Sequence, residues 1–243
     1  MPNESTAKIV IVALALCLVC SALVSVTAVA LRPVQERNAE LERKREILRV
    51  AGIPGDAESV QRRFERIEVR IVDLPTGRYI GGEDPDPGGT TRLSAGDDIA
   101  GIKRRVNRVT VYLVRRDARL ETVVLPVHGY GLWSTMYGYI ALSGDASTVR
   151  GITFYAHAET PGLGGEISEP AWQRGWEGKR VFDDRGELSL RVVKPGAGGD
   201  DPYRVDGISG ATLTSSGVNN LVRFWLGEQG FGPYLQRLRA REG

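Results

Sequence analysis

The hydrophobic residues of this chain form one long apolar run, several short runs and one periodic stripe. From Ile9 to Leu31 no residue carries a charge. As a helix at ~1.5 Å per residue, this run would be about 34 Å long, which matches the hydrocarbon core of a bilayer. The apolar region of a cleaved signal peptide is shorter, about 7–15 residues, and a buried core helix would have a polar face. We therefore expect a retained transmembrane helix over 9–31 after an N-terminal tail over 1–8, with a cleaved signal peptide as the alternative.

A charged segment follows the apolar run. Over 35–49, acidic and basic residues occur at helical i,i+4 spacing, and the Ala-Gly-Ile-Pro-Gly sequence at 51–55 ends the pattern. We predict that 32–66 is a helical juxtamembrane segment and that 67–243 is the main domain.

The period then changes to that of β-strands. Five β-branched, apolar runs have strand length: 67–74, 109–114, 120–127, 149–156 and 187–193. The short charged stretch 115–119 predicts a hairpin loop between the second and third of these runs. Two segments rich in Gly, Asp and Pro, 80–101 and 194–202, predict longer loops.

The last periodic segment is helical. From 218 to 225 apolar residues recur at i, i+3, i+4 and i+7, which predicts a helix with one apolar face. Thr214 or Ser215 can begin this helix and Gly227 can end it. The predicted fold class is therefore α+β: a single N-terminal transmembrane helix followed by a mainly antiparallel domain.

Composition excludes several classes of site. The chain has 243 residues, 26% of them charged, and a net charge of +2, which indicates no general attraction to nucleic acid. It contains two cysteines, both inside the apolar run, and two histidines. These are too few for a zinc ribbon, a Cys-ligated iron–sulfur cluster or a disulfide framework, so no metal site is predicted. Any redox chemistry would use something other than a metal or a thiol.

The side of the membrane on which the domain lies stays open. Basic residues at Arg32, Arg37 and 43–45 follow the apolar run, and by the positive-inside rule they favour a cytoplasmic domain. Glutamates are interleaved with them, and long domains cross the membrane largely regardless of charge.

Small and hydroxylated residues gather at 206–217, directly before the terminal helix. Backbone N–H groups at a helix start, together with the helix dipole, attract phosphate. Gly210 would let the main chain approach a ligand, and Ser209, Thr212 and Thr214 offer hydroxyls. A turn that merely caps the helix is the alternative. The pattern G-x-x-x-x-G-K-[ST] is missing from the sequence, so a nucleotide-hydrolysing loop is not predicted.

Within this segment Asp206, Ser209, Gly210, Ala211 and Thr212 form the pattern D-x-x-S-G-A-T. It resembles the attachment motif of covalently flavinylated FMN-binding domains. The resemblance implies that a flavin transferase uses FAD to esterify the phosphate of FMN to Thr212, with the other four residues shaping the attachment loop.

Further blocks resemble the C subunits of the Na⁺-translocating NADH:quinone reductases: Ile-Lys-Arg-Arg at 102–105, Gly-Tyr-Gly-Leu-Trp-Ser-Thr-Met-Tyr-Gly at 129–138 and Glu-Thr-Pro-Gly-Leu-Gly-Gly-Glu at 159–166. This resemblance covers essentially the whole chain apart from the Gly/Pro/Asp-rich stretch 80–92. It implies covalent FMN as the cofactor.

Four other residues are candidate FMN contacts. Trp133 could lie against the flavin ring, because aromatic faces stack on planar rings, although a packing role explains it as well. Thr160, Gly162 and Leu163 lie in a loop after a predicted strand and could line the ligand.

The resemblance also implies a function. An assembly of six subunits in the bacterial inner membrane would oxidise NADH, reduce ubiquinone and export Na⁺, and this chain would relay electrons through its FMN. Catalysis would belong to the assembly, and no catalytic residue is assigned to this chain. The implied partners are the other subunits, the flavin transferase and membrane lipid, with the soluble domain on the periplasmic side. The alternatives are a flavinylated subunit of a related ion-translocating electron-transport complex and a non-redox anchored binding module.

Overall fold

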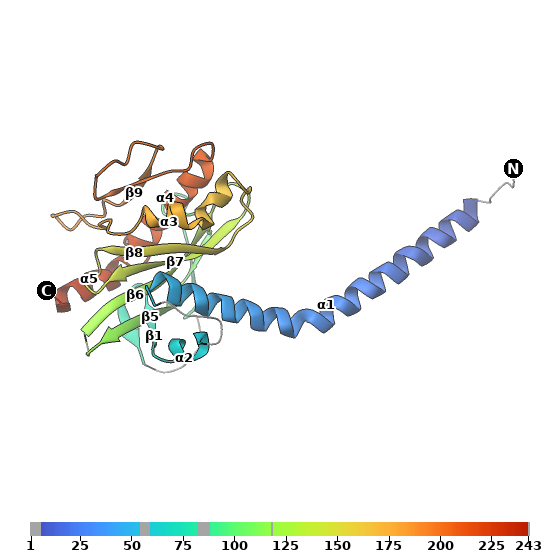
Figure 1. The fold of residues 1–243 in the computed structure, drawn as a ribbon, viewed down its shortest axis with the longest axis horizontal. Helices are drawn as coiled ribbons and strands as arrows, with labels where there is room; N and C mark the ends of the chain where they lie inside the picture. The colour runs from blue at the N-terminus through green and yellow to red at the C-terminus, as the bar shows by residue number, and fades with distance from the viewer. Residues whose placement is uncertain (1–5, 54–58, 82–87, 118, 243) are drawn as a thin grey trace. The chain divides into compact units, whose positions relative to one another are not determined.

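The computed structural model describes residues 6–53, 59–81, 88–117 and 119–242. The chain forms two compact units, Met1–Arg43 and Lys44–Gly243. Figure 1 shows the long N-terminal helix and the α+β domain with its central sheet.

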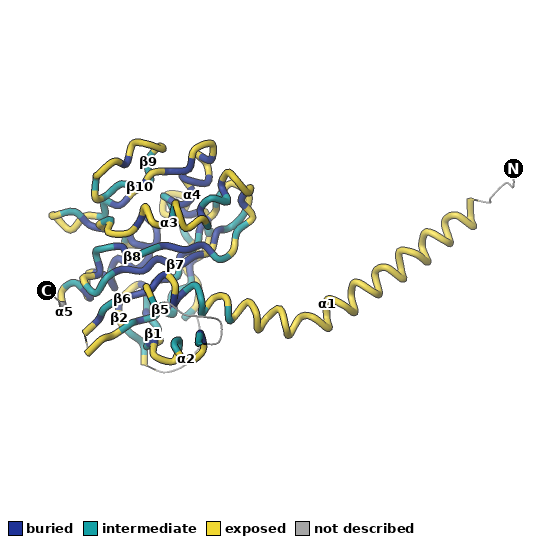
Figure 2. Tube along the Cα trace, viewed as in Figure 1, coloured by how far each residue is buried: buried dark blue, intermediate teal, exposed yellow. Residues whose placement is uncertain are grey.

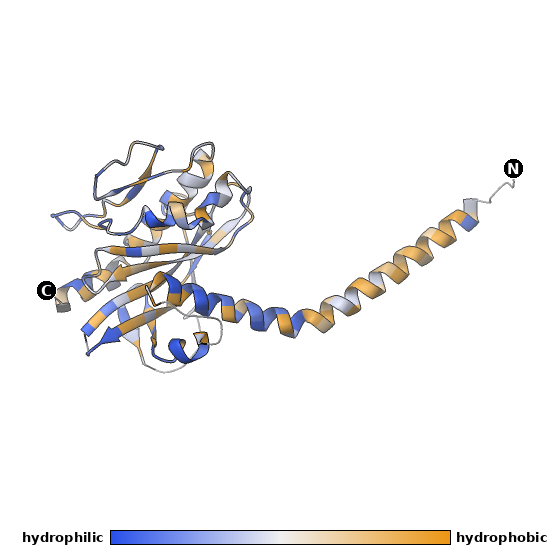
Figure 3. Cartoon of the chain, in the orientation of Figure 1, coloured by the Kyte–Doolittle hydropathy of each residue, from blue (hydrophilic) through white to orange (hydrophobic). Residues whose placement is uncertain are grey.

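The N-terminal helix α1, Thr6–Val50, is continuous, with Pro33 inside it. Among the described residues it is the one helix long and apolar enough to cross a membrane. Its apolar part is hydrophobic along its length (Figure 3), and the large hydrophobic side chains there are exposed. The charged segment predicted over 35–49 is the last part of this same helix. Ile47, Leu48 and Val50 are buried, so the compact unit that begins at Lys44 includes the end of α1 and the predicted domain boundary at 67 lies inside that unit.

The main sheet has six strands: β1 (Glu68–Asp73), β2 (Arg78–Ile80), β5 (Arg108–Arg116), β6 (Arg119–Tyr130), β7 (Thr135–Ser143) and β8 (Val149–Ala156). Their order is β2-β1-β5-β6-β7-β8, and every neighbouring pair is antiparallel. β3 (Thr90–Arg92) pairs antiparallel with β4 (Arg104–Val106), and β9 (Arg191–Val193) pairs parallel with β10 (Arg204–Asp206). The other helices are α2 (Val60–Phe64), η1 (Gly164–Ser168, a 3₁₀ helix), α3 (Pro170–Arg174), α4 (Thr212–Leu226) and α5 (Gly232–Glu242). The predicted class, α+β and mainly antiparallel, is confirmed.

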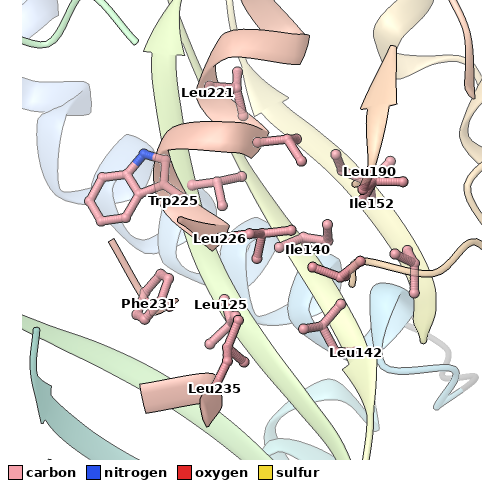
Figure 4. Packing of buried hydrophobic residues seen from close by; sticks show 14 of the residues in the cluster. Leu125, Ile140, Leu142, Ile152, Leu190, Leu221, Trp225, Leu226, Phe231 and Leu235 are labelled. Atoms are coloured by element: carbon pink, nitrogen blue, oxygen red, sulfur yellow. The ribbon is translucent and has the colours of Figure 1, made fainter. Parts of the chain in front are cut away.

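Both faces of the central strands are covered, and Figure 2 shows these strands as buried. On one face Leu125 and Ile140 join Trp225 of α4 in the main hydrophobic cluster (Figure 4). On the other face Val124 joins a second cluster that contains Ile47 of α1. Val124 and Leu125 are consecutive, and successive side chains of a strand point to opposite faces. The central strands are therefore apolar on both faces. Helix α4 packs against the face that carries Leu125 and Ile140.

The structure differs from the predicted strands in several places, and the three-residue strands β2, β4 and β10 lie outside every predicted run. β7 is not predicted, because a strand buried on both faces lacks a clean alternation and Gly138 interrupts its apolar pattern. The run predicted over 187–193 is a strand only at Arg191–Val193. The loop predicted over 80–101 contains β3, which is exposed along its length and so gives no apolar signal.

Candidate functional site

Thr212 is the first residue of α4 and is exposed. The helix begins two or three residues earlier than predicted, because Ala211 occupies the cap position and Thr214 and Ser215 point into the protein. The first helical hydrogen bond joins the Ser215 N–H to the Ala211 carbonyl at 2.9 Å. The N–H groups of residues 212–214 precede that bond, at the positive end of a 15-residue helix. An exposed hydroxyl thus lies where a phosphate group would be attracted.

The loop before α4 is held by contacts of its polar groups. Gly210 has φ +75°, a left-handed conformation that favours glycine. The Asp206 carboxylate accepts a hydrogen bond from the Gly198 N–H at 2.8 Å, and its carbonyl accepts one from the Trp172 indole at 2.8 Å. The Ser215 hydroxyl accepts one from the Ile208 N–H at 2.9 Å. Asp206 thus joins the end of β10 to Gly198 of the preceding loop and to Trp172 of α3.

Three segments far apart in the sequence meet at this end of α4. A Cβ at Gly217 would lie 2.6 Å from the Tyr130 carbonyl oxygen at the end of β6. A Cβ at Gly164, which ends the loop after β8, would collide with the Thr214 hydroxyl. Glycine at these two positions therefore lets α4 lie directly against the β6–β7 turn and the 157–164 loop. A Cβ at Gly210 would lie 3.2 Å from Leu163, so this predicted contact residue borders the attachment loop.

Glu159 joins the three segments, and sequence reasoning did not select it. Its carboxylate accepts hydrogen bonds from the backbone N–H groups of Leu132 (3.1 Å), Trp133 (2.9 Å) and Ser134 (3.4 Å). It also accepts one from the Thr214 hydroxyl at 2.5 Å. Glu159 is only 4% exposed. An acidic residue in a Gly/Thr/Pro loop gives no periodic signal, so the tertiary contacts alone reveal it.

Burial opposes ionisation of Glu159, but the hydrogen bonds from Thr214 and the turn outweigh it and hold the pKa below its usual value. Unfolding releases these bonds, so the pKa rises to the ordinary glutamate value. The carboxylate therefore stabilises the fold fully above that ordinary value, and this contribution is lost as pH falls through the lower, folded-state pKa.

We expect the unfolding free energy of the wild type to fall more steeply than that of Glu159→Gln between about pH 5 and pH 3, because only the wild type must protonate this carboxylate. Urea denaturation of the two full-length proteins across this range measures the difference. Parallel pH profiles would contradict the prediction, since Asp145 and Asp183, whose pKa values are also lowered, are present in both proteins.

The surface around Thr212 carries exposed apolar side chains. Trp133 is 63% exposed, Leu213 62%, Leu163 45% and Leu132 40%. A single exposed apolar side chain is ordinary, but a group of large ones at one place is unusual on a protein surface. Such a group is typical of a binding site for a ligand or a partner.

The remaining predicted contacts lie in the same loop as Leu163. Thr160 and Gly162 are exposed, Gly162 has φ +73°, and the space beside its Cα is open. Of the predicted residues, the structure brings Leu163 to Gly210 and joins the Trp133 backbone to Glu159.

The two histidines have structural surroundings. His157 Nε2 lies 2.7 Å from the Ser168 hydroxyl, and its Nδ1 accepts the Glu159 N–H. The His128 ring lies against Tyr137 and Trp225, and burial lowers its pKa. Among the described residues no group of three or more His, Cys, Asp or Glu could hold a metal ion.

Known proteins resemble the chain at two scales. A family model described as the FMN-binding domain matches residues 131–227, which include all three segments of the site. Two relatives, each named as the C subunit of Na(+)-translocating NADH-quinone reductase, match over nearly the full length. The one from Yersinia pestis is 48% identical over 98% of this chain and 94% of its own length. The one from Pseudomonas aeruginosa is 46% identical over 99% and 98%.

Solved structures agree with these relatives. The crystal structure of Shewanella oneidensis NqrC superposes with a TM-score of 0.75 at 35% identity, covering 82% of this chain and 97% of that one. The crystal structure of the same reductase's C subunit from Parabacteroides distasonis has a TM-score of 0.65 at 29% identity, covering 86% and 96%.

Proposed function

Because this chain belongs to the family of the C subunits of Na⁺-translocating NADH-quinone reductase, we propose that it carries covalent FMN as a membrane-anchored electron relay of such an assembly. The family predicted from the sequence motifs and FMN as the cofactor are confirmed. The covalent link, the individual contacts and the side of the membrane are the proposed parts.

The observation that carries the proposal is the position of Thr212. Thr212 is exposed at the first position of α4, and it follows a loop in which the backbone of Gly210 has a left-handed conformation. The residues fit FMN: N–H groups at the helix start suit a phosphate, and the exposed apolar side chains of Trp133 and Leu163 suit a planar ring.

The attachment of FMN to Thr212 is a transfer of the FMN phosphoryl group from FAD to the threonine hydroxyl. The Thr212 oxygen forms a bond to the phosphorus on the FMN side of the pyrophosphate, the P–O bond to the other phosphate breaks, and AMP leaves. The hydroxyl proton passes to a base of the transferase. Asp206, Ser209, Gly210 and Ala211 present Thr212 to that enzyme, and Thr214, which is buried, supports the helix end from below.

The protein's own part in electron transfer is to hold the cofactor in place. FMN supplies the electron chemistry when bound, and the protein sets its position and surroundings. The N–H groups of 212–214 would hold the phosphate, and the ring would be held by four residues: Trp133, Thr160, Gly162 and Leu163. A covalent tether keeps the cofactor on the domain between its electron donor and acceptor.

The names of the relatives define the reaction of the assembly as NADH oxidation and quinone reduction coupled to Na⁺ transport. We place this chain within such an assembly as one of six subunits, between NADH and ubiquinone. Its own sequence contains no G-x-G-x-x-G dinucleotide fingerprint, and no acidic residue lies within 9–31. NADH binding and ion conduction are therefore assigned to the partner subunits.

The apolar part of α1 and the membership of a membrane complex make this a membrane-anchored protein. We place the anchor in the bacterial inner membrane, in contact with lipid, and the domain in the periplasm. The charge count favours the opposite side, but that rule weakens for long translocated domains.

Trypsin digestion tests both the link and the side. No Lys or Arg lies between Arg204 and Arg223, so digestion of the denatured protein, made together with the flavin transferase, is expected to leave the flavin fluorescence on peptide 205–223.

Trypsin added outside intact spheroplasts is expected to cleave the native domain, with disrupted membranes as the control for its susceptibility. Fluorescence on another peptide would overturn the link. Protection in spheroplasts, with cleavage in disrupted membranes, would overturn the periplasmic placement.

A further inference from the structure

We propose that Glu159 is a positioning residue: its buried carboxylate holds the β6–β7 turn, the loop after β8 and the start of α4 in the arrangement that receives the flavin. The consequence for the flavin rests on the proposed function, whereas the consequence for the backbone does not. Glu159 lies outside the attachment motif, and its carboxylate bonds to protein groups of the turn and of α4 while its own backbone belongs to the loop.

The first argument is the geometry of the turn. Three consecutive N–H groups, those of residues 132–134, point at one oxygen of Glu159. With these N–H groups directed inward, the side chains of Leu132 and Trp133 remain at the surface, 40% and 63% exposed. Large apolar side chains would otherwise favour burial. The carboxylate thus keeps an energetically unfavourable, ligand-ready surface in place.

The second argument is that the protein is shaped around this carboxylate. A Cβ at Gly131 would lie 2.5 Å from Glu159 Oε1, and a Cβ at Gly164 would lie 3.0 Å from Oε2. Two glycines from two different segments therefore leave the room that the carboxylate occupies. The Ser134 hydroxyl, which accepts the Ala158 N–H at 2.7 Å, joins the same two segments beside it.

The third argument is the charge. Among the described residues, the hydrogen-bond partners of the carboxylate are neutral N–H and O–H donors, and His157 lies two residues away. A buried charge is costly unless it is well hydrogen-bonded, and these donors supply the hydrogen bonds. Removing the carboxylate would in turn leave the donors of the turn and of Thr214 without their acceptor. A negative charge beneath the site also opposes the addition of electrons nearby, which lowers the reduction potential of a flavin held there.

Two substitutions separate charge from hydrogen bonding. Glu159→Gln keeps the size of the side chain and removes the charge. Its amide oxygen can still accept from the turn N–H groups at the place of Oε1, but an NH₂ group at the place of Oε2 donates and cannot accept from the Thr214 hydroxyl. Thr214→Val keeps the charge and removes only the hydroxyl donor. Glu169→Gln is the matched control, because Glu169 is exposed between η1 and α3 and makes no side-chain cap hydrogen bond.

Hydrogen exchange of the full-length chain in detergent, made without flavin transferase, tests the positioning. In Glu159→Gln, peptides covering 130–135 are expected to exchange at least about tenfold faster than in the wild type, since charged hydrogen bonds are lost. In Thr214→Val the increase is expected in the first turn of α4. Glu169→Gln is expected to match the wild type. If Glu159→Gln does not fold, Thr214→Val decides, and wild-type exchange in the variants that fold would overturn the proposal.

The flavin's midpoint potential supplies a readout that a merely structural role would not change in this pattern. Glu159→Gln, loaded with flavin, is expected to shift to a more positive potential, whereas Thr214→Val keeps the charge and the wild-type potential. Equal shifts in both variants would overturn an effect of the charge. If the wild-type chain never acquires flavin, the proposed function is wrong. The hydrogen-exchange experiment uses flavin-free protein, so it still tests whether Glu159 positions the backbone.

Discussion

Replacing Thr212 by alanine is expected to abolish flavin fluorescence of the protein band on a denaturing gel, while the fold is retained. The residue is exposed at the first position of α4, so the loss of its side chain removes no core packing. Only a hydroxyl can form the phosphoester, and alanine has none. In membranes that contain the whole assembly, quinone reduction by NADH is expected to fall with it, since the relay would lack its tethered cofactor.

Two matched variants sharpen this experiment. Thr212→Ser keeps the hydroxyl and is expected to keep fluorescence. Ser216→Ala removes an exposed hydroxyl from the next turn of the same helix and is also expected to keep it. Fluorescence that persists in Thr212→Ala would rule out attachment at this residue.

Replacing Trp225 by alanine is expected to lower the free energy of unfolding by about 3–5 kcal/mol, as for other large-to-small core substitutions. Trp225 is 1% exposed and lies in the main cluster between α4 and the sheet. Its indole donates a hydrogen bond to the His128 carbonyl at 2.7 Å, and its ring contacts those of His128 and Phe231. The substitution leaves a cavity near the C-terminal end of α4 and removes the indole donor to the His128 carbonyl.

The control is the same substitution at the other end of the exposure scale. Trp133→Ala removes a side chain that is 63% exposed, so the unfolding free energy is expected to stay within about 0.5 kcal/mol of the wild type. Urea denaturation of the flavin-free full-length proteins measures both. A comparable loss in the two variants would mean that Trp133 packs in solution as a core residue.

The predicted elements succeeded where one face, or a whole segment, is apolar. Apolar residues that run or repeat along the chain predict the long helix over 9–31, the strands β1, β5, β6 and β8 and the apolar stripe of α4. β7 lies between two other strands and is buried on both faces, so its sequence shows no simple period. The predicted start of α4 is too late, because Thr214 and Ser215 have the residue types of helix caps but use their hydroxyls in tertiary contacts.

The sequence by itself determined the membrane helix, the α+β class, the family and the motif that ends at Thr212, because each depends on residues close together in the chain. Only the tertiary structure decided which segments surround Thr212. Glycines at 164 and 217 allow the close approach, and the Glu159 carboxylate joins backbone and side-chain donors that lie 25 to 55 residues away. Such contacts depend on how the strands and the helix pack. Local sequence patterns do not show which residues, far apart in the chain, come together in the fold.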